Sequence, residues 1–490
     1  MTNPVISKRK IFDTILICVP VNTLTNWEDE FRNWIGSNCD LPKIMYRAIH
    51  SNTSLSHQVD VIRRWKRDGG VLIMSISTFT SMSGDTGKTL DDPLFDPNAK
   101  EARDALVSPD LVIIDEAHSV LTNDKTKKFK AFDSMKTKRR IALTGTPLSN
   151  NLMEYYFMTT WVQPDCFESK RFFQSTYLDP IVQGSCSDSH IGAKARQRKA
   201  TEDLHKALDG FVQRRSSQLL LKDLPPMQQA VIVVRRSRIQ QKLQKVCPHR
   251  KFLEWYSLLR PVFNHPGTLL PNSSCVSNTV IAHTANGDDS SAIEMQEDDY
   301  SGTSRINDGW WKNVLAKFSN PKCIEYGAKM VILLQILAHS ELLGEKVVVF
   351  SQCLKTLDYI EEILNHPNWA ESVVTIKDIQ GNKVVGNWVR NRDYLRIDGS
   401  HSASKRGSLV SSFKSTDSLK AFLISTRAGG IGINLTNANR IVLMDSGWNP
   451  SVEEQAVYRC YRYGQVRKRH SLFKNTINGI GRLIYMYSFT

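Results

Sequence analysis

The stretch LVIIDEAH (111–118) joins a short apolar run to two adjacent carboxylates. Consecutive apolar residues without alternation are typical of a strand buried on both faces, as in a parallel sheet covered by helices. Ligands of such sheets bind at the carboxyl ends of the strands, and this end carries Asp115 and Glu116. Asp115 suits the binding of Mg²⁺ through water, and Glu116 suits the activation of an attacking water. A strand followed by an acidic helix cap is the plainer interpretation.

Similar runs recur along the chain, each followed by a polar turn and a helix-like segment. They are TILICVP (14–20), GVLIMSIS (70–77), RRIALTG (139–145), KVVVFSQ (346–352), KAFLIST (420–426) and NRIVLMD (439–445). Strands interleaved with helices indicate βαβ units. The runs fall before about residue 150 and after about residue 345, so the pattern predicts an α/β fold with two lobes.

The region between the two groups has a different character. Residues 150–265 are mostly helical in pattern, whereas residues 272–308 are polar, acidic and poor in large apolar groups, which predicts a disordered or loop insertion. The predicted domains are a first lobe (1–147), a helical subdomain and lobe connection (148–265), the insertion (266–325) and a second lobe (326–490).

Charge and cysteine content bound the class of protein. The 490 residues carry a formal net charge of +15, which favours a polyanionic partner, with nucleic acid first, although solubility alone is an alternative. The nine cysteines are widely spaced and contain no C-x-x-C, which argues against a disulfide framework and a zinc site. No apolar run is long enough to span a bilayer, so we expect no membrane partner.

Two further strand ends carry small and hydroxylated residues. ALTGTPLSNNL (142–152) places Thr144, Gly145 and Thr146 after a strand, where a plain strand-to-helix turn is the alternative. LISTRAGGIGINL (423–435) places backbone N–H groups and hydroxyls where they can hold a phosphate. The residues concerned there are Ser425, Thr426, Gly429, Gly430 and Gly432.

Cations gather in QAVYRCYRYGQ (455–465). Gln455, Arg459 and Arg462 lie at i, i+4 and i+7, so on a helix they share one face. Two arginines aimed at one point suit the stabilisation of charge on a transferring phosphoryl group, and a solvated basic face is the alternative.

The segment ILICVPVNTLTNWEDEFRNW (15–34) reads as a strand, a turn and an amphipathic helix. Asn22 or Thr23 is placed to cap that helix. Exposed backbone N–H groups at the start of the helix could bind a DNA phosphate.

Taken together, these pieces resemble the Swi/Snf family of superfamily 2 DNA translocases. The matching segments occur in the family's order: PVNTLTNWEDEF, DEAH, LTGTPLSNNL, VVVFSQ, YLRIDGSHS, STRAGGIGINL, DSGWNP and QAVYRCYRYGQ. W-N-P followed by R-x-x-R-x-G-Q separates this family from RNA helicases, so RNA unwinding is disfavoured. GGVLIM, LDGFVQRR, VFNHPG and the long insertion resemble the ATRX-like subgroup, and within it the androgen-receptor-interacting helicase.

The resemblance implies two RecA-like lobes with ATP and Mg²⁺ between them, double-stranded DNA across both, chromatin remodelling as the output and a nuclear location. By position, Asp115 and Glu116 match the Walker B pair, with Asp115 at the metal, and Arg459 and Arg462 match the arginine fingers, beside Gln455. His118 and Thr144 to Thr146 match the elements that couple ATP to DNA. Further matches are DNA contacts at Thr23, Ser425, Thr426, Arg427, Gly429 and Gly430, and nucleotide contacts at Gly432 and Asn434.

Two segments depart from the family pattern. SGDTGKTL (83–90) contains Gly-Lys-Thr, but the phosphate-loop pattern G-x-x-x-x-G-K-[ST] needs glycine where Met82 stands. In the family that loop precedes the strand at 15–20 by roughly 30 residues, whereas residues 1–14 contain no glycine. HSLFKNTINGIGR (470–482) then delays the expected strand LIYMYSF (483–489).

These departures leave two functional hypotheses open. The first is that the chain is a truncated piece of a DNA translocase, with an inserted or unspliced segment at 470–482. Because it has no Walker A loop, we expect such a chain to hydrolyse ATP very poorly. The alternative is a short form that binds DNA or nuclear proteins, such as transcription regulators, without hydrolysing ATP.

Overall fold

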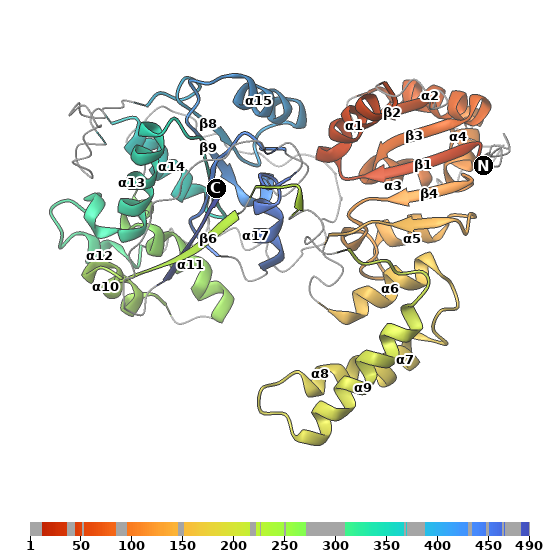
Figure 1. Cartoon of the computed structure of the whole chain (residues 1–490), viewed down its shortest axis with the longest axis horizontal. Coiled ribbons are helices and arrows are strands. Elements are labelled where there is room, and N and C mark those ends of the chain that lie inside the picture. The colour runs from red at the N-terminus through yellow and green to blue at the C-terminus, as the bar shows by residue number, and fades with distance from the viewer. Residues whose placement is uncertain are drawn as a thin grey trace. The chain divides into compact units, whose positions relative to one another are not determined.

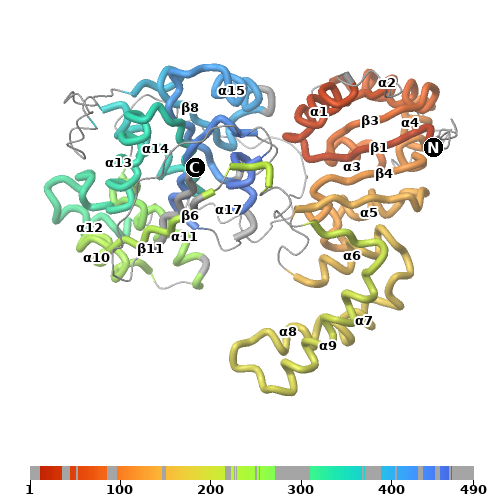
Figure 2. Tube along the Cα trace, in the orientation of Figure 1, coloured from red at the N-terminus to blue at the C-terminus, as the bar shows by residue number. Residues whose placement is uncertain are grey.

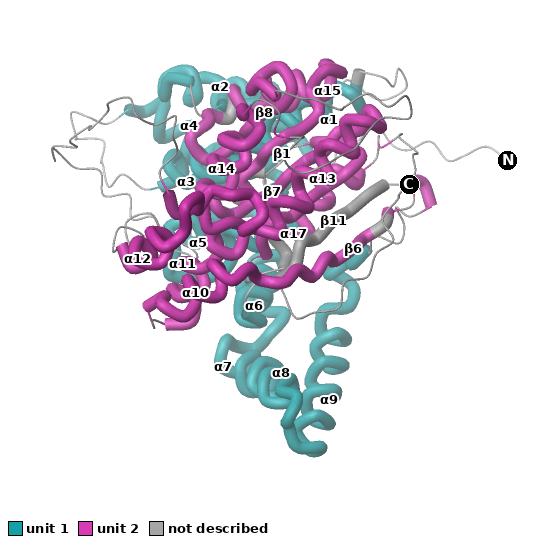
Figure 3. Tube along the Cα trace, turned by 90° about the vertical axis from the view of Figure 1, so that its left-hand side faces the viewer, with its two compact units in different colours: residues 1–216 teal, residues 217–490 magenta. Residues whose placement is uncertain are grey.

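The chain forms two compact units, Met1–Ser216 and Ser217–Thr490, drawn in two colours in Figure 3. The computed structural model describes residues 12–36, 45–50, 53–84, 96–145, 151–215, 222–225, 227–248, 251–270, 309–366, 369, 388–429, 434–446, 450–462, 465 and 482–489. The insertion predicted at 272–308 and the end of SGDTGKTL lie outside the described residues.

The first unit alternates strands and helices and then continues as helices only (Figure 1). Its strands are β1 (Thr14–Val19), β2 (Tyr46–Ile49), β3 (Gly70–Ser75), β4 (Leu111–Ile114) and β5 (Arg140–Ala142). Its α-helices are α1 (Leu24–Gly36), α2 (Leu55–Asp68), α3 (Ile76–Ser83), α4 (Pro97–Val107), α5 (Lys127–Asp133), α6 (Leu152–Val162), α7 (Lys170–Phe173), α8 (Asp179–Gly184) and α9 (Ile191–Leu208). Short 3₁₀ turns η1 (Val21–Thr23) and η2 (Ala117–Ser119) and the π-helical η3 (Gln174–Leu178) complete it.

The sheet of this unit is parallel throughout, in the order β2-β3-β1-β4-β5. Alternate residues of each strand face opposite sides, and both sides are covered. Leu16, Cys18 and Met74 pack with Trp65 and Phe79 of α2 and α3. Ile17, Val71 and Ile73 pack against α1 on the other side. This double burial explains why the strands read as continuous apolar runs.

Helices α7 to α9 extend away from the sheet, as the yellow part of the tube shows (Figure 2). They are held by a separate aromatic cluster that includes Phe167, Phe173 and Tyr177 together with Leu204 of α9. Ring pairs such as Phe167–Phe173, with centroids 4.9 Å apart, pack edge to face. The extension therefore has a small core of its own.

The second unit contains a six-stranded sheet. Its strands are β6 (Met227–Val234), β7 (Val347–Ser351), β8 (Tyr394–Ile397), β9 (Ala421–Ser425), β10 (Arg440–Leu443) and β11 (Arg482–Phe489). Its helices are α10 (Arg238–Val246), α11 (Phe252–Asn264), η5 (Pro266–Leu269), α12 (Lys312–Leu315), η7 (Ile324–Tyr326), α13 (Ala328–Leu342), α14 (Leu354–Leu364), α15 (Ala403–Ser415), α16 (Thr426–Gly429) and α17 (Pro450–Val457).

The strand order in this sheet is β6-β11-β10-β7-β9-β8. β10, β7, β9 and β8 pair in parallel, whereas β11 runs antiparallel to both β10 and β6. Val347 and Val349 face the cluster formed by α13 and α14, and Val348 and Phe350 face the cluster that includes α15 and α17. Both faces are again covered by helices.

The predicted two-lobed α/β fold is confirmed, and all seven apolar runs form strands. LIYMYSF (483–489) also forms a strand, as expected. The helical prediction for 150–265 is wrong at residues 227–234, which form β6. The β-branched residues of AVIVV suit a strand, and pairing with β11 satisfies the backbone.

Two adjacent glycines fix where β3 begins. Gly69 ends α2 with φ of +75° and donates its N–H to Trp65 O, and Gly70 follows with φ of +95°. A Cβ added at Gly70 would lie 2.3 Å from Met45 O. Both the backbone conformation and the close approach of Met45, directly before β2, therefore require glycine at 70.

We predict that Gly70→Ala lowers the free energy of unfolding of the first unit by roughly 1–3 kcal/mol, from the strained φ alone. Gly84→Ala is the matched control, because its φ is −62° and the nearest atom to an added Cβ is 3.8 Å away. The measurement is urea denaturation followed by circular dichroism. Equal stabilities of the two variants would contradict the prediction.

Candidate functional site

The carboxyl end of β4 carries the two predicted acidic residues. The Asp115 N–H donates to Cys18 O of the neighbouring strand at 2.9 Å, which fixes the backbone at the strand end. Its Oδ1 accepts the N–H of Glu116 at 3.0 Å, and its Oδ2 accepts Nε1–H of Trp27 at 2.9 Å. Trp27 of α1 therefore orients the carboxylate, a role that the sequence analysis missed because the two residues are distant in the chain.

Glu116 adopts a left-handed backbone conformation, with φ of 50° and ψ of 44°. This conformation is uncommon for a residue other than glycine and costs on the order of 1 kcal/mol. It ends the strand sharply and starts the short turn η2, in which Ala117 N donates to Leu143 O at 2.9 Å. The turn joins the ends of β4 and β5.

His118 and Thr144 make the second link between these strand ends. Nδ1 of His118 lies 2.7 Å from Oγ1 of Thr144 and 3.4 Å from Oε2 of Glu116. Burial lowers the pKa of His118, and the charges of Glu154 and Asp115 only partly oppose that effect. Sequence reasoning grouped His118 with Thr144, and the structure brings them into contact. A Cβ added at Gly145 would meet no other atom within 4 Å. Thr146 lies outside the described residues.

Of the two residues predicted as alternative caps of the helix, Asn22 and Thr23, the prediction is wrong for Thr23. Thr23 is buried in η1, and its hydroxyl donates to Pro20 O at 2.9 Å. The 3₁₀ turn runs directly into α1, so the hydroxyl stabilises the turn instead of accepting an N–H of the helix. Its predicted DNA contact stays a prediction.

At the carboxyl end of β9, Ser425 is buried and its Oγ accepts the N–H of Ala428 at 3.3 Å. Thr426, Arg427 and Gly429 form the short helix α16. Oδ1 of Asn434 accepts the N–H of Thr436 at 3.4 Å. Gly430 and Gly432 lie outside the described residues.

The shared helix face predicted for Gln455, Arg459 and Arg462 is wrong in part. Helix α17 ends at Val457, so only Gln455 lies in it. Beyond it the chain tightens, since Arg459 N donates to Ala456 O and Gln465 N donates to Arg462 O, three residues back in each case. Both arginines therefore lie in turns directly after the helix.

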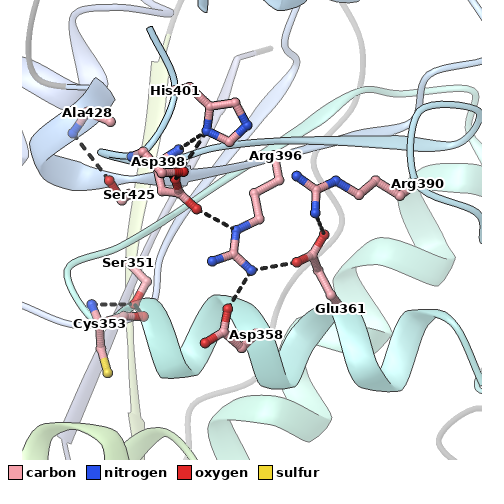
Figure 4. Close-up of polar contacts among 11 residues, drawn as sticks. Ser351, Cys353, Asp358, Glu361, Arg390, Arg396, Asp398, His401, Ser425 and Ala428 are labelled. Carbon is pink, nitrogen blue, oxygen red and sulfur yellow. Dashed lines mark hydrogen bonds and ion pairs between the residues drawn. The ribbon is translucent and has the colours of Figure 1, made fainter. Parts of the chain in front are cut away.

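A buried cationic centre organises the end of β8 (Figure 4). Nη1 of Arg396 lies 2.6 Å from Oδ1 of Asp358 and 2.5 Å from Oε2 of Glu361, both on α14. Its Nε lies 3.0 Å from Oδ2 of Asp398. One guanidinium thus ties β8 to α14 and to the loop that follows β8.

Asp398 in turn shapes that loop. Its Oδ1 accepts both the N–H of Ser400 at 3.1 Å and the hydroxyl of Ser400 at 2.5 Å, and it lies 3.1 Å from Nδ1 of His401. Burial alone would raise the pKa of Asp398, but the hydrogen bonds from Ser400 and the charge of Arg396 outweigh it and lower the pKa to about 2. The carboxylate therefore stays ionised.

The Asp115 carboxylate fits a hydrated Mg²⁺. A carboxylate has about four lone-pair positions, and the two hydrogen bonds to Asp115 leave the others available to a metal-bound water. The described residues contain no cluster of three or more His, Cys, Asp or Glu side chains able to hold a metal by themselves. They also include no helix long and apolar enough to cross a membrane.

Comparison with known families decides the assignment. Residues 4–285 match the SNF2-related domain, and residues 328–464 match the helicase conserved C-terminal domain. The chain belongs to the SNF2 family. The first match contains the strand ends of β4 and β5, and the second contains those of β8 and β9.

Curated SNF2 relatives align over nearly all of the chain. It is 33% identical to "Protein CHROMATIN REMODELING 20" of Arabidopsis thaliana, over 92% of this chain and 31% of that protein. It is 31% identical to "Helicase ARIP4" of Xenopus tropicalis, over 92% and 38%. It is 30% identical to the "Transcriptional regulator ATRX homolog" of Drosophila melanogaster, over 94% and 40%. The chain therefore spans between about a third and two fifths of these relatives.

Among solved structures, the chain resembles the Sulfolobus solfataricus SWI2/SNF2 ATPase core in complex with dsDNA. The sequence identity is 20%, the TM-score is 0.32, and the match covers 93% of this chain and 75% of that one.

We predict that His118→Gln flattens the pH dependence of stability of the first unit. Because the folded-state pKa of His118 is lowered, its contribution is present above about pH 6.5 and is lost as the pH falls through the folded-state pKa. Urea denaturation between pH 7.5 and about 5 measures this slope. His205→Gln, which removes an exposed histidine of α9, is the control, and a slope unchanged by His118→Gln would refute the prediction.

A second pH prediction concerns Asp398. Because its folded-state pKa is lowered to about 2, its contribution is present above about pH 4 and is lost as the pH falls towards 2. Asp398→Asn should destabilise the second unit by about 2 kcal/mol at pH 7, and that difference should shrink below about pH 4. The exposed Asp417→Asn serves as the control. A difference that stays constant with pH would count against this role.

Proposed function

We propose that the chain is the core of an ATP-dependent translocase on double-stranded DNA, of the chromatin-remodelling type, acting in the nucleus. The observation that carries the proposal is the constellation at the ends of β4 and β5: Asp115 held by Trp27, Glu116 in its left-handed turn, and His118 bonded to Thr144. A side-chain link between two strand ends is the kind of element that can relay a change at one ligand to another.

In this proposal the predicted residues have separate tasks. Asp115 holds Mg²⁺ through water, and Glu116 orients and deprotonates the attacking water. Arg459 and Arg462, beside Gln455, stabilise negative charge on the transferring phosphoryl group. The state of the nucleotide is coupled to DNA binding by His118, Thr144, Gly145 and Thr146. The backbone phosphates of DNA meet Thr23, Ser425, Thr426, Arg427, Gly429 and Gly430, and Gly432 and Asn434 contact the nucleotide.

The residues fit Mg²⁺ better than they fit the triphosphate. The sequence contains no G-x-x-x-x-G-K-[ST], so it lacks the loop and lysine that cradle the β- and γ-phosphates. We therefore propose that this chain by itself turns over ATP very slowly. The same observation favours a second candidate function, the binding of DNA or of nuclear proteins, such as transcription regulators, without ATP hydrolysis.

The proposed function is tested by binding and turnover on the same preparation. We expect the chain to bind a short DNA duplex with an affinity that falls steeply as salt rises, since phosphate contacts release counterions. We expect no more than background ATPase activity with that duplex. Glu116→Gln should leave duplex affinity within about twofold, because Glu116 is assigned to hydrolysis and not to DNA.

Each outcome has a definite meaning. Failure to bind duplex DNA at low salt would overturn the DNA-binding part of the proposal. DNA-stimulated ATPase activity at the level of an intact family member would overturn the assignment of slow turnover. Preference for RNA over duplex DNA would restore the RNA-unwinding hypothesis.

A further inference from the structure

A buried polar network lies at the carboxyl edge of the second sheet, and none of the roles above uses it. Its centre is Asn264, the fully buried last residue of α11. Nδ2 of Asn264 donates to Oδ2 of Asp445 at 3.0 Å and to Oγ1 of Thr356 at 2.9 Å. Its Oδ1 accepts Nζ of Lys329 at 3.2 Å. These three contacts fix the amide orientation, because a flipped amide would turn its oxygen towards the Asp445 carboxylate.

The two charged members hold the chain just beyond β10. Lys329 of α13 donates from Nζ to Met444 O at 2.6 Å. Asp445 accepts the hydroxyl of Ser351 at 2.6 Å and the N–H of Gln352 at 2.7 Å, both at the end of β7. Lys329 is 4% exposed and Asp445 is 5% exposed. Buried charges are costly unless they are paired and hydrogen-bonded, and these contacts supply partners for both charges.

A further contact reaches the next residue. The hydroxyl of Tyr256, on α11, donates to Ser446 O at 2.8 Å. Residues 444–446 are thus held by side chains from α11 and α13, and Asp445 also contacts the end of β7. Helix α17 begins at Pro450, only a few residues further on.

The other end of that segment is held differently. Leu435 N donates to Arg459 O at 2.9 Å, and Ala456, Val457 and Cys460 are buried in the apolar cluster of the sheet. Backbone and apolar contacts therefore fix the chain around the arginines. At its point of departure from β10, Met444 N donates to Phe350 O at 3.0 Å and the Met444 side chain is buried in the apolar cluster. The polar network adds side-chain contacts to Met444 O, Asp445 and Ser446 O beyond that last backbone bond.

We propose that Asn264, Lys329 and Asp445 form a positioning centre that fixes residues 444–446 and thereby the placement of α17 and of Arg459 and Arg462. This proposal rests on the proposed function insofar as the two arginines act on the nucleotide. The three residues position the arginines through the backbone and are not themselves in contact with the reacting groups.

Hydrogen exchange of the whole chain, measured by mass spectrometry, tests the positioning centre without nucleotide or DNA. Lys329→Met removes the donor to Met444 O and Asn264. We expect exchange in peptides covering 444–462 to rise about tenfold, which corresponds to the loss of about one such hydrogen bond. Exchange in peptides covering β8 and β9 should stay within about twofold.

Lys346→Met is the matched control. Lys346 is 3% exposed, and its Nζ donates to Phe413 O at 2.8 Å and Thr416 O at 2.7 Å, before β7 and at the opposite end of the strands. Its exchange changes should fall around residues 413–420 and not at 444–462. If Lys329→Met does not fold, Tyr256→Phe removes the hydroxyl that donates to Ser446 O and keeps the ring, and a smaller rise confined to 444–462 is expected.

Unchanged exchange at 444–462 in Lys329→Met would overturn the positioning role. A uniform rise across the second unit would overturn it equally, since it would indicate general loss of stability. Because the readout needs neither ATP nor DNA, either result leaves the DNA-binding and ATPase tests of the proposed function to stand or fall separately.

Discussion

Hydrogen bonding between parallel strands is the constraint on which the rest of the molecule depends. Parallel neighbours require a crossover between them, so helices cover both faces and all carboxyl ends meet at one edge. In the first unit the pairing of Cys18 with Ile114 places Asp115 one residue beyond the ladder. Side chains that are far apart in sequence, such as His118 and Thr144, come into contact for the same reason.

The sequence predicted most of the frame and only part of the site. Continuous apolar runs located seven strands, because a strand buried on both faces needs apolar residues at successive positions. Strand β8 was not among them, because YLRI contains Arg396, whose charge is matched by carboxylates from α14 that the sequence does not place beside it. Adjacent residues such as Asp115 and Glu116 could be predicted together. Trp27 and Asn264 could not, because their partners are distant in the chain.

Helical periodicity also gave a prediction that is wrong in part, the shared helix face after residue 455. The spacing of Gln455, Arg459 and Arg462 fits a helix, but α17 ends at Val457. Periodicity describes which residues would share a face if a helix continued, and it does not say where the helix ends. Here the chain turns inward so that Cys460 and Tyr461 become buried, and the hydroxyl of Tyr461 donates to Pro225 O at 3.0 Å. Tertiary packing therefore decided the outcome.

The second unit places several charges in its interior. Besides Arg396, Nε of Arg440 lies 2.5 Å from Oε2 of Glu345, and Lys346 reaches two carbonyl oxygens near the end of α15. These groups lie at or beside strand ends, where backbone groups leave the ladder and need other partners. Most other buried residues of these strands are apolar, and the charges lie towards the ends of the strands.

The place of β11 has a consequence for how the protein is made. β11 lies between β6 and β10, although every other described element of the second unit comes between β6 and β11 in the chain. During synthesis β6 leaves the ribosome first and has no neighbour to pair with until residues 482–489 follow. Its backbone stays open to wrong partners in that interval, and pairing over such a separation is slow. Nascent chains of this protein are therefore expected to depend on chaperones until translation has passed β11.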